Sequence, residues 1–164
     1  MVYSYDYFYQ NSLFYSSCWS KDTEITFVNA LIEHKRAGNF HRDGNNCRAV
    51  LCMLYDVHKV HGRKVQYDVG QKKVKKLKER HATFSWIINL PGVVVNHERR
   101  YVVAEDHIWE IICKARVLGK CYVNMYEDML EEMCVLLAPD RPIEGLGDGT
   151  EEVDPLDDFV MMLE

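Results

Sequence analysis

Three consecutive stretches of the chain place apolar residues at the three- and four-residue spacing of an amphipathic helix. Ser20, a residue type that caps helix N-termini, opens the first stretch, and Gly38 closes it. The second stretch ends at Gly62, and Pro91 stops the third. The stripes are Phe27, Val28, Leu31 and Ile32 in the first stretch, Val50, Met53, Leu54 and Val57 in the second, and Val74, Leu77, His81, Phe84 and Ile88 in the third.

The shared spacing predicts three helices that pack around one core, and Trp19, Val50, Leu54, Val74 and Leu77 are expected in it. We therefore predict a mainly α fold with a three-helix, helix-turn-helix core and an additional helical C-terminal extension.

The flanking segments have weaker patterns. Residues 1–17 alternate Tyr and Phe with polar residues, which fits either a strand or a loosely ordered arm. A β-rich patch covers residues 93–95 and 101–103, and residues 104–115 and 124–137 are predicted as two further helices. The expected organisation is an aromatic arm over 1–18, the three-helix core over 19–90, the helical extension over 91–138 and an acidic flexible tail over 139–164.

Charge is distributed unevenly along the chain, which has a formal net charge of -5. Residues 59–80 hold nine Lys and Arg against two acids, whereas residues 140–164 hold nine acids against one Arg. The third predicted helix places its basic residues opposite its apolar stripe, where they can contact DNA phosphates or form an ordinary solvated face. These candidate DNA-binding residues are Lys72, Lys73, Lys75, Lys76 and Arg80.

A longer pattern begins at Trp19 and continues through FVNALIEHKRAGN at 27–39 and KKVKKLKERHATF at 72–84. Its most specific part is PGVVVNHERRYVVAEDHIWEIICKA at 91–115, with Gly92, Glu98, Arg99, Val102, Ala104, Asp106 and Trp109 at the matching positions. Over about residues 19–137 the chain resembles the plant Myb/SANT-like DNA-binding domain family, which includes Harbinger-transposon Myb-like proteins. The chain departs from the family pattern where Val50, Val74 and Val95 replace aromatic residues and Asn96 replaces an aspartate.

The resemblance implies a nuclear, non-enzymatic transcriptional regulator whose partner is double-stranded DNA. The lysine-rich third helix favours this interpretation. The replaced aromatic residues favour an alternative, in which an adaptor of the same fold has lost DNA binding and contacts a transposase or a corepressor instead.

The acidic tail has a pattern of its own. Asp154 and Pro155 are typical of a helix start, and an apolar stripe follows them. We expect this segment, or the helical extension, to bind a protein partner; the alternatives are a solubilising tail or a segment that folds back on the lysines. The stripe consists of Leu156, Phe159, Val160 and Leu163.

Other chemistry is not indicated. The spacing of Cys47 and Cys52 would direct them to different sides of a helix, which argues against a zinc site with His58 and His61. Cys52 is instead expected in the core. No nucleophile signature, phosphate-binding loop, signal peptide or membrane span is recognisable. The expectation is no catalytic residue, no metal, no cofactor and no membrane partner.

Overall fold

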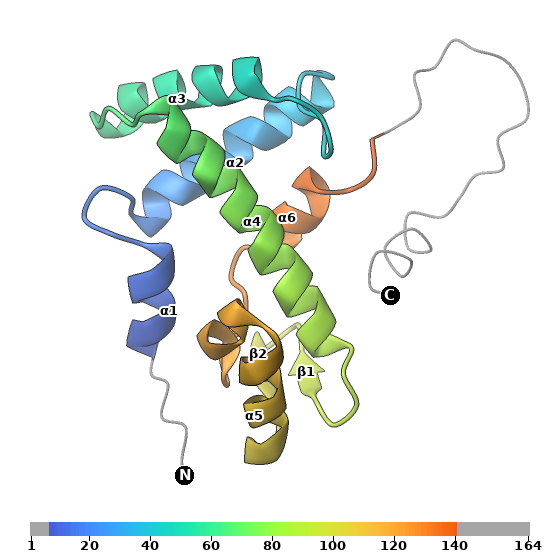
Figure 1. Cartoon of the computed structure of the whole chain (residues 1–164). Helices are drawn as coiled ribbons and strands as arrows, with labels where there is room; N and C mark the ends of the chain where they lie inside the picture. Colours follow the sequence, from blue (N-terminus) through green and yellow to red (C-terminus); the bar gives the residue numbers. More distant parts are fainter. Residues whose placement is uncertain (1–6, 141–164) are drawn as a thin grey trace, which may run out of the picture.

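The computed structural model describes residues 7–140, and its centre is three helices: α2 (Lys21–Arg36), α3 (Cys47–His61) and α4 (Tyr67–Ile88). These are the three helices that the apolar spacing predicts, and they cross one another in the upper half of Figure 1. The chain then adds a small hairpin and two short helices around the far end of α4, and a last short helix returns to pack against α2. The predicted mainly α fold, with a three-helix core and a helical C-terminal extension, is confirmed.

Local sequence sets the helix ends. Ser20 caps α2, because its Oγ accepts a hydrogen bond from the backbone N–H of Thr23 at 3.1 Å. Gly62 ends α3 in the left-handed conformation, with φ of 67°. Gln66 is the N-cap residue of α4, and Asp68 lies in the first turn.

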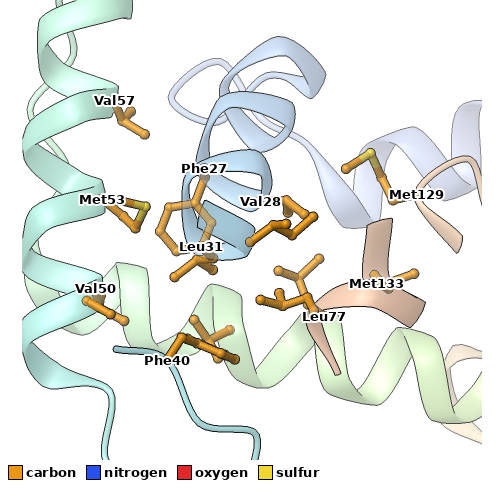
Figure 2. Close-up of a cluster of buried hydrophobic side chains, with 14 of the residues drawn as sticks. Phe27, Val28, Leu31, Phe40, Val50, Met53, Val57, Leu77, Met129 and Met133 are labelled. Atoms are coloured by element: carbon orange, nitrogen blue, oxygen red, sulfur yellow. The ribbon is translucent and has the colours of Figure 1, made fainter. Parts of the chain in front are cut away.

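The first core lies where α2, α3 and the N-terminal half of α4 meet (Figure 2). The five residues expected in one core are all buried in this cluster, so that prediction is confirmed. Helix α6 (Leu130–Leu136) contributes Met133 and Leu136 to the same cluster. Residues far beyond the third helix therefore complete the core that the first three helices begin.

The second core surrounds the C-terminal half of α4. Strands β1 (Val94–Asn96) and β2 (Tyr101–Val103) pair antiparallel, with Val95 opposite Val102. Helix α5 (Asp106–Ala115) and the 3₁₀ helix η1 (Val117–Tyr122) follow. The buried side chains of this core include Phe84, Ile87, Val102, Trp109, Ile112 and Tyr122. Helix α4 belongs to both cores and joins them.

The N-terminal segment is neither a strand nor a loose arm over residues 7–14, where it forms helix α1 (Tyr7–Phe14). Contacts with η1 and the chain beyond it explain this difference. The Nε2 of Gln10 donates to the carbonyl oxygens of Cys121 at 3.1 Å and Tyr126 at 3.3 Å. Phe14 is buried in the second core.

The helix expected over 124–137 is much shorter, because α6 begins only at Leu130. Asn124 has a positive φ of 55°, which interrupts a right-handed helix. The side chain of Glu127 turns into the interior, and its Oε1 accepts from the backbone N–H of Met129 at 3.2 Å. Residues 123–129 are therefore a structured connection between the two cores.

Gly70 is buried on α4 where that helix packs tightly against α3. A Cβ added there would lie 2.9 Å from Cγ1 of Val50 and 3.1 Å from Cδ2 of Leu54, both in the first core. We expect Gly70→Ala to lower the free energy of unfolding by about 1–2 kcal/mol, because overpacking outweighs the gain of about 1 kcal/mol in helix propensity. Urea unfolding would measure this change.

A double-mutant cycle provides the control. Val50→Ala removes the atom that the new methyl group meets, so the two substitutions together should cost less than the sum of their separate effects. Strict additivity would show that the two helices do not touch at Gly70.

Candidate nucleic-acid interface

The outward side of α4 carries the exposed part of the predicted basic surface. Lys72 and Lys75 are exposed, and the side chain of Lys76 is 38% exposed with its Nζ 4.0 Å from Oε2 of Glu79. We call Lys72, Lys75 and Lys76 the lysine face. Asp68 and Glu79 are the acids exposed on α4 beside it. The face combines three cations with nearby carboxylates, so its positive potential is moderate.

Lys73 lies beside this face and is half-buried. Its Nζ is 5.0 Å from the centroid of the Trp19 ring, an arrangement that allows a cation–π interaction. Burial lowers the pKa of Lys73, although the nearby charge of Glu24 opposes this shift. Lys73 therefore points toward Trp19, just before α2, whereas the side chain of Lys72 is exposed.

Arg80 is buried, and the expectation that it shares the exposed basic surface is wrong. Its side chain is 2% exposed, and its guanidinium donates to Glu24 Oε1 at 2.7 Å and to Glu127 Oε1 at 2.7 Å. Its Nε donates to Glu127 Oε2 at 3.1 Å, and its Cζ lies 4.0 Å from the centroid of the Phe14 ring. Arg80 is therefore an internal structural cation.

Helix geometry explains the difference between Arg80 and the lysines. A side chain advances by about 100° per residue, so four residues add about 40° beyond a full turn. Lys72, Lys76 and Arg80 follow one another at this interval, and the row drifts by about 80° in all. The drift takes Arg80 from the solvent side to the side that faces α2 and residues 122–127.

Two tyrosine hydroxyls complete the hydrogen bonding around Arg80. Tyr15 donates to Glu24 Oε2 at 2.7 Å, and Tyr122 donates to Glu127 Oε2 at 2.6 Å. We call Arg80, Glu24, Glu127, Tyr15 and Tyr122 the ion cluster. The cluster contains one cation and two carboxylates, and the hydroxyl donors help to satisfy the extra acceptors.

The ion cluster shifts the protonation of its members. Burial on its own would lower the pKa of Arg80, but the charges of Glu127 and Glu24 raise it above its ordinary value. Burial, followed by the charge of Glu127, raises the pKa of Tyr122. The guanidinium therefore stays charged and the tyrosine hydroxyl neutral, as the hydrogen bonds require.

A separate groove adjoins the lysine face. Arg63 and Lys64, in the loop before α4, line it together with Lys73 and Trp19. The charge count of residues 59–80 includes these two cations, but the helical pattern gave no reason to place them at a site. We call this the basic groove; the remaining lining residues are Ser16, Cys18, Val65, Gln66 and Val69.

The other candidate residues are dispersed. Cys52 is exposed and not in the core, because Val50, Met53 and Leu54 occupy the inward side of α3. His58 is exposed, whereas His61 Nε2 is 2.8 Å from Thr26 Oγ1. Within residues 7–140 no three potential metal ligands come together, and no helix has the length and apolar character to cross a bilayer. The predicted partner-binding residues Leu156, Phe159, Val160 and Leu163 lie outside the described residues.

Three helices packed around one core, with basic residues on the outer side of the third helix, are typical of a class of small helical DNA-binding domains. Helices α2, α3 and α4 have this arrangement. The sequence model of the Myb/SANT-like DNA-binding domain matches residues 18–111, more than half of the chain. The chain belongs to this family. No curated protein and no solved structure matches it significantly. Membership of a non-enzymatic DNA-binding family suggests a DNA-binding regulatory role.

The first prediction from this site concerns Arg80. Arg80→Met leaves two buried carboxylates without their cation, so we expect the free energy of unfolding to fall by about 3–5 kcal/mol. The matched variant Lys76→Met, at a partly exposed position on the same helix, should change it by about 0.5 kcal/mol or less. Urea unfolding followed by circular dichroism tests both. If the Arg80→Met protein had unchanged stability but bound DNA more weakly, Arg80 would be a DNA-contacting residue and not an internal structural cation.

The second prediction concerns His81, which is buried with its Nε2 3.6 Å from Sγ of Cys134. Burial lowers its pKa below the ordinary 6.5, although the charge of Glu127 opposes the shift. The unfolded chain then takes up the proton more readily than the folded one, so His81 makes stability fall as the pH drops below 6.5. The effect is absent well above that pH.

Unfolding free energies at about pH 7.5 and about pH 5.5 measure this effect. His81→Gln should reduce the loss of stability between the two values, whereas His58→Gln, at an exposed histidine, should leave it unchanged. An identical pH dependence in the wild type and His81→Gln would contradict the prediction.

Proposed function

We propose that the chain is a nuclear, non-enzymatic transcriptional regulator that binds double-stranded DNA through the lysine face of α4. The observation that carries the proposal is the position of Lys72 and Lys75, which are exposed on the third helix of a Myb/SANT-like domain. A third helix is the element that such three-helix folds place in the DNA major groove.

The chemistry of the face supports contact with phosphates more than with bases. Lysine is a compact charge on a flexible stem, which suits phosphate oxygens, whereas specific base contacts commonly use the fork of an arginine. The one arginine of α4 is in the ion cluster. Each phosphate neutralised by a lysine releases about 0.9 counterions, so binding should depend steeply on salt.

A second candidate function is an adaptor of the same fold that binds protein, of the transposase-partner or corepressor type. The outer side of α3 favours it, because Leu51 is 54% exposed and Tyr55, one turn further on, is 68% exposed. Exposed apolar and aromatic residues on one helix side are typical of protein contacts.

We propose that the acidic tail binds a protein partner. Its apolar stripe, Leu156, Phe159, Val160 and Leu163, has the spacing of a helix that binds in a groove. Carboxylates between these residues would be repelled by DNA, so the tail and the lysine face are proposed to have different ligands.

A salt titration of DNA binding separates the two functions. Lys72→Glu with Lys75→Glu should weaken binding to all duplex sequences alike and reduce the slope of log K against log salt concentration by about two. Fluorescence anisotropy with a labelled duplex measures both quantities.

The matched control is Lys114→Glu with Lys120→Glu, the same charge change at exposed positions on α5 and η1. It should leave the salt slope nearly unchanged. Equal effects of the two double variants would mean that net charge, and not α4, determines binding. Absence of binding by the wild type at low salt would support the adaptor.

A further inference from the structure

The basic groove is a hollow of about 590 Å³ beside the N-terminal end of α4. Residues 16–19, the loop before α4 and the first two turns of α4 form its walls. Its apolar lining consists of Trp19, which is 2% exposed, with Val65 and Val69. The groove therefore offers apolar contact beside cationic side chains.

The charged residues that line the groove have one sign. Arg63, Lys64 and Lys73 line it, and no carboxylate is among its lining residues. One groove along α2 and α6 is mainly acidic, because Glu33, Glu131 and Glu132 line it. The other combines Lys35 and Arg36 with Asp140. A ligand with both apolar and acidic groups would match the basic groove and be disfavoured at the mainly acidic one. The basic groove is also the one whose lining contains cations and no carboxylate.

A buried indole and a half-buried ammonium group lie together at the groove. The indole Nε1 of Trp19 is buried and has no hydrogen-bond partner among residues 7–140. Lys73 is half-buried above the same ring, at 5.0 Å from its centroid. A carboxylate placed near Lys73 would offset the desolvation of that ammonium group.

The chain itself contains a segment of this composition. Residues 151–163, EEVDPLDDFVMML, hold five acids, and apolar residues make up most of the remainder. An acidic segment with dense apolar residues matches the groove better than a DNA phosphate does, because a phosphate has no apolar part for Val65 and Val69.

The length of the chain allows the contact. Asp140 lies at the C-terminal end of α2, where its Oδ1 is 3.9 Å from Nζ of Lys35. The groove lies at the opposite end of α2, since Trp19 directly precedes the cap residue of that helix. Figure 1 shows α2 running between these two sides of the molecule.

Helix α2 has 16 residues and is about 24 Å long. Residues 141–150 can span at most about 33 Å, so residue 151 can reach the groove. A short tether also gives the segment a local concentration of about millimolar, so that a modest intrinsic affinity suffices.

We propose that the basic groove is a binding site for an acidic, apolar peptide and that residues 151–163 of the same chain occupy it. The consequence for DNA rests on the proposed function: the docked segment engages Lys73 beside the lysine face and places its carboxylates next to Lys72. The occupied form then binds DNA more weakly. A protein that captures residues 151–163 frees the groove and strengthens DNA binding.

The test compares two full-length double variants by amide NMR and by DNA binding. Asp157→Asn with Asp158→Asn removes two charges from the segment, and Glu98→Gln with Glu105→Gln removes two exposed charges elsewhere. The first variant should shift the Trp19 indole resonance and the amides of residues 63–73; the second should not. Asp157→Asn with Asp158→Asn should also tighten DNA binding about threefold at low salt. This is the change expected if the segment occupies the groove in about two of three wild-type molecules and leaves it in the variant.

A groove variant gives the reciprocal result. In a chain carrying Arg63→Glu and Lys64→Glu, neutralising Asp157 and Asp158 should no longer shift the Trp19 indole. Groove shifts in a protein that binds no DNA in any form would support the docking and refute the proposed function. Unmoved groove resonances in Asp157→Asn with Asp158→Asn would overturn the docking. If Arg63→Glu with Lys64→Glu then weakened DNA binding, the groove would be a site for the DNA backbone instead.

Discussion

The arrangement of the helices depends on one buried cation. A guanidinium removed from water is unfavourable unless its charge and its N–H groups are matched, and Arg80 meets both conditions through Glu24 on α2 and Glu127 before α6. Each of these residues lies on a different element, so satisfying Arg80 fixes α2, α4 and residues 122–129 relative to one another. Because Arg80 is on the same helix as Lys72 and Lys75, this internal match also determines the direction in which the lysine face points.

Periodicity in the sequence was sufficient for the three main helices and the first core. Apolar residues at helical spacing identify the buried side of a helix independently of what covers it, which is why Val50, Leu54, Val74 and Leu77 were predicted correctly. The same reasoning was wrong for Arg80. A basic residue at the border of the polar face can be exposed or buried, and the partners that decide this are 56 and 47 residues away in the sequence.

Long-range contacts also explain the other differences. Residues 7–14 form a helix against η1, and Gln10 contacts carbonyl groups 111 and 116 residues further along the chain. Glu127 interrupts the long helix expected over 124–137 because its carboxylate belongs to the ion cluster. Of the candidate site, the sequence predicted the exposed lysines of α4 but did not place Arg63 and Lys64. These two residues lie in a loop, where no periodicity indicates what they adjoin.

The span of the ion cluster has a consequence for how the protein is made. A ribosome releases the chain from its N-terminus, so Arg80 and Glu24 emerge well before Glu127 and Tyr122. Until residue 127 is available, the guanidinium has one of its two carboxylates, and the interior around α4 stays incomplete. The stretch that matches the family, residues 18–111, ends before either of the late partners. Helix α4 therefore reaches its final position only when the segment beyond the matched domain has been synthesised and has folded back onto it.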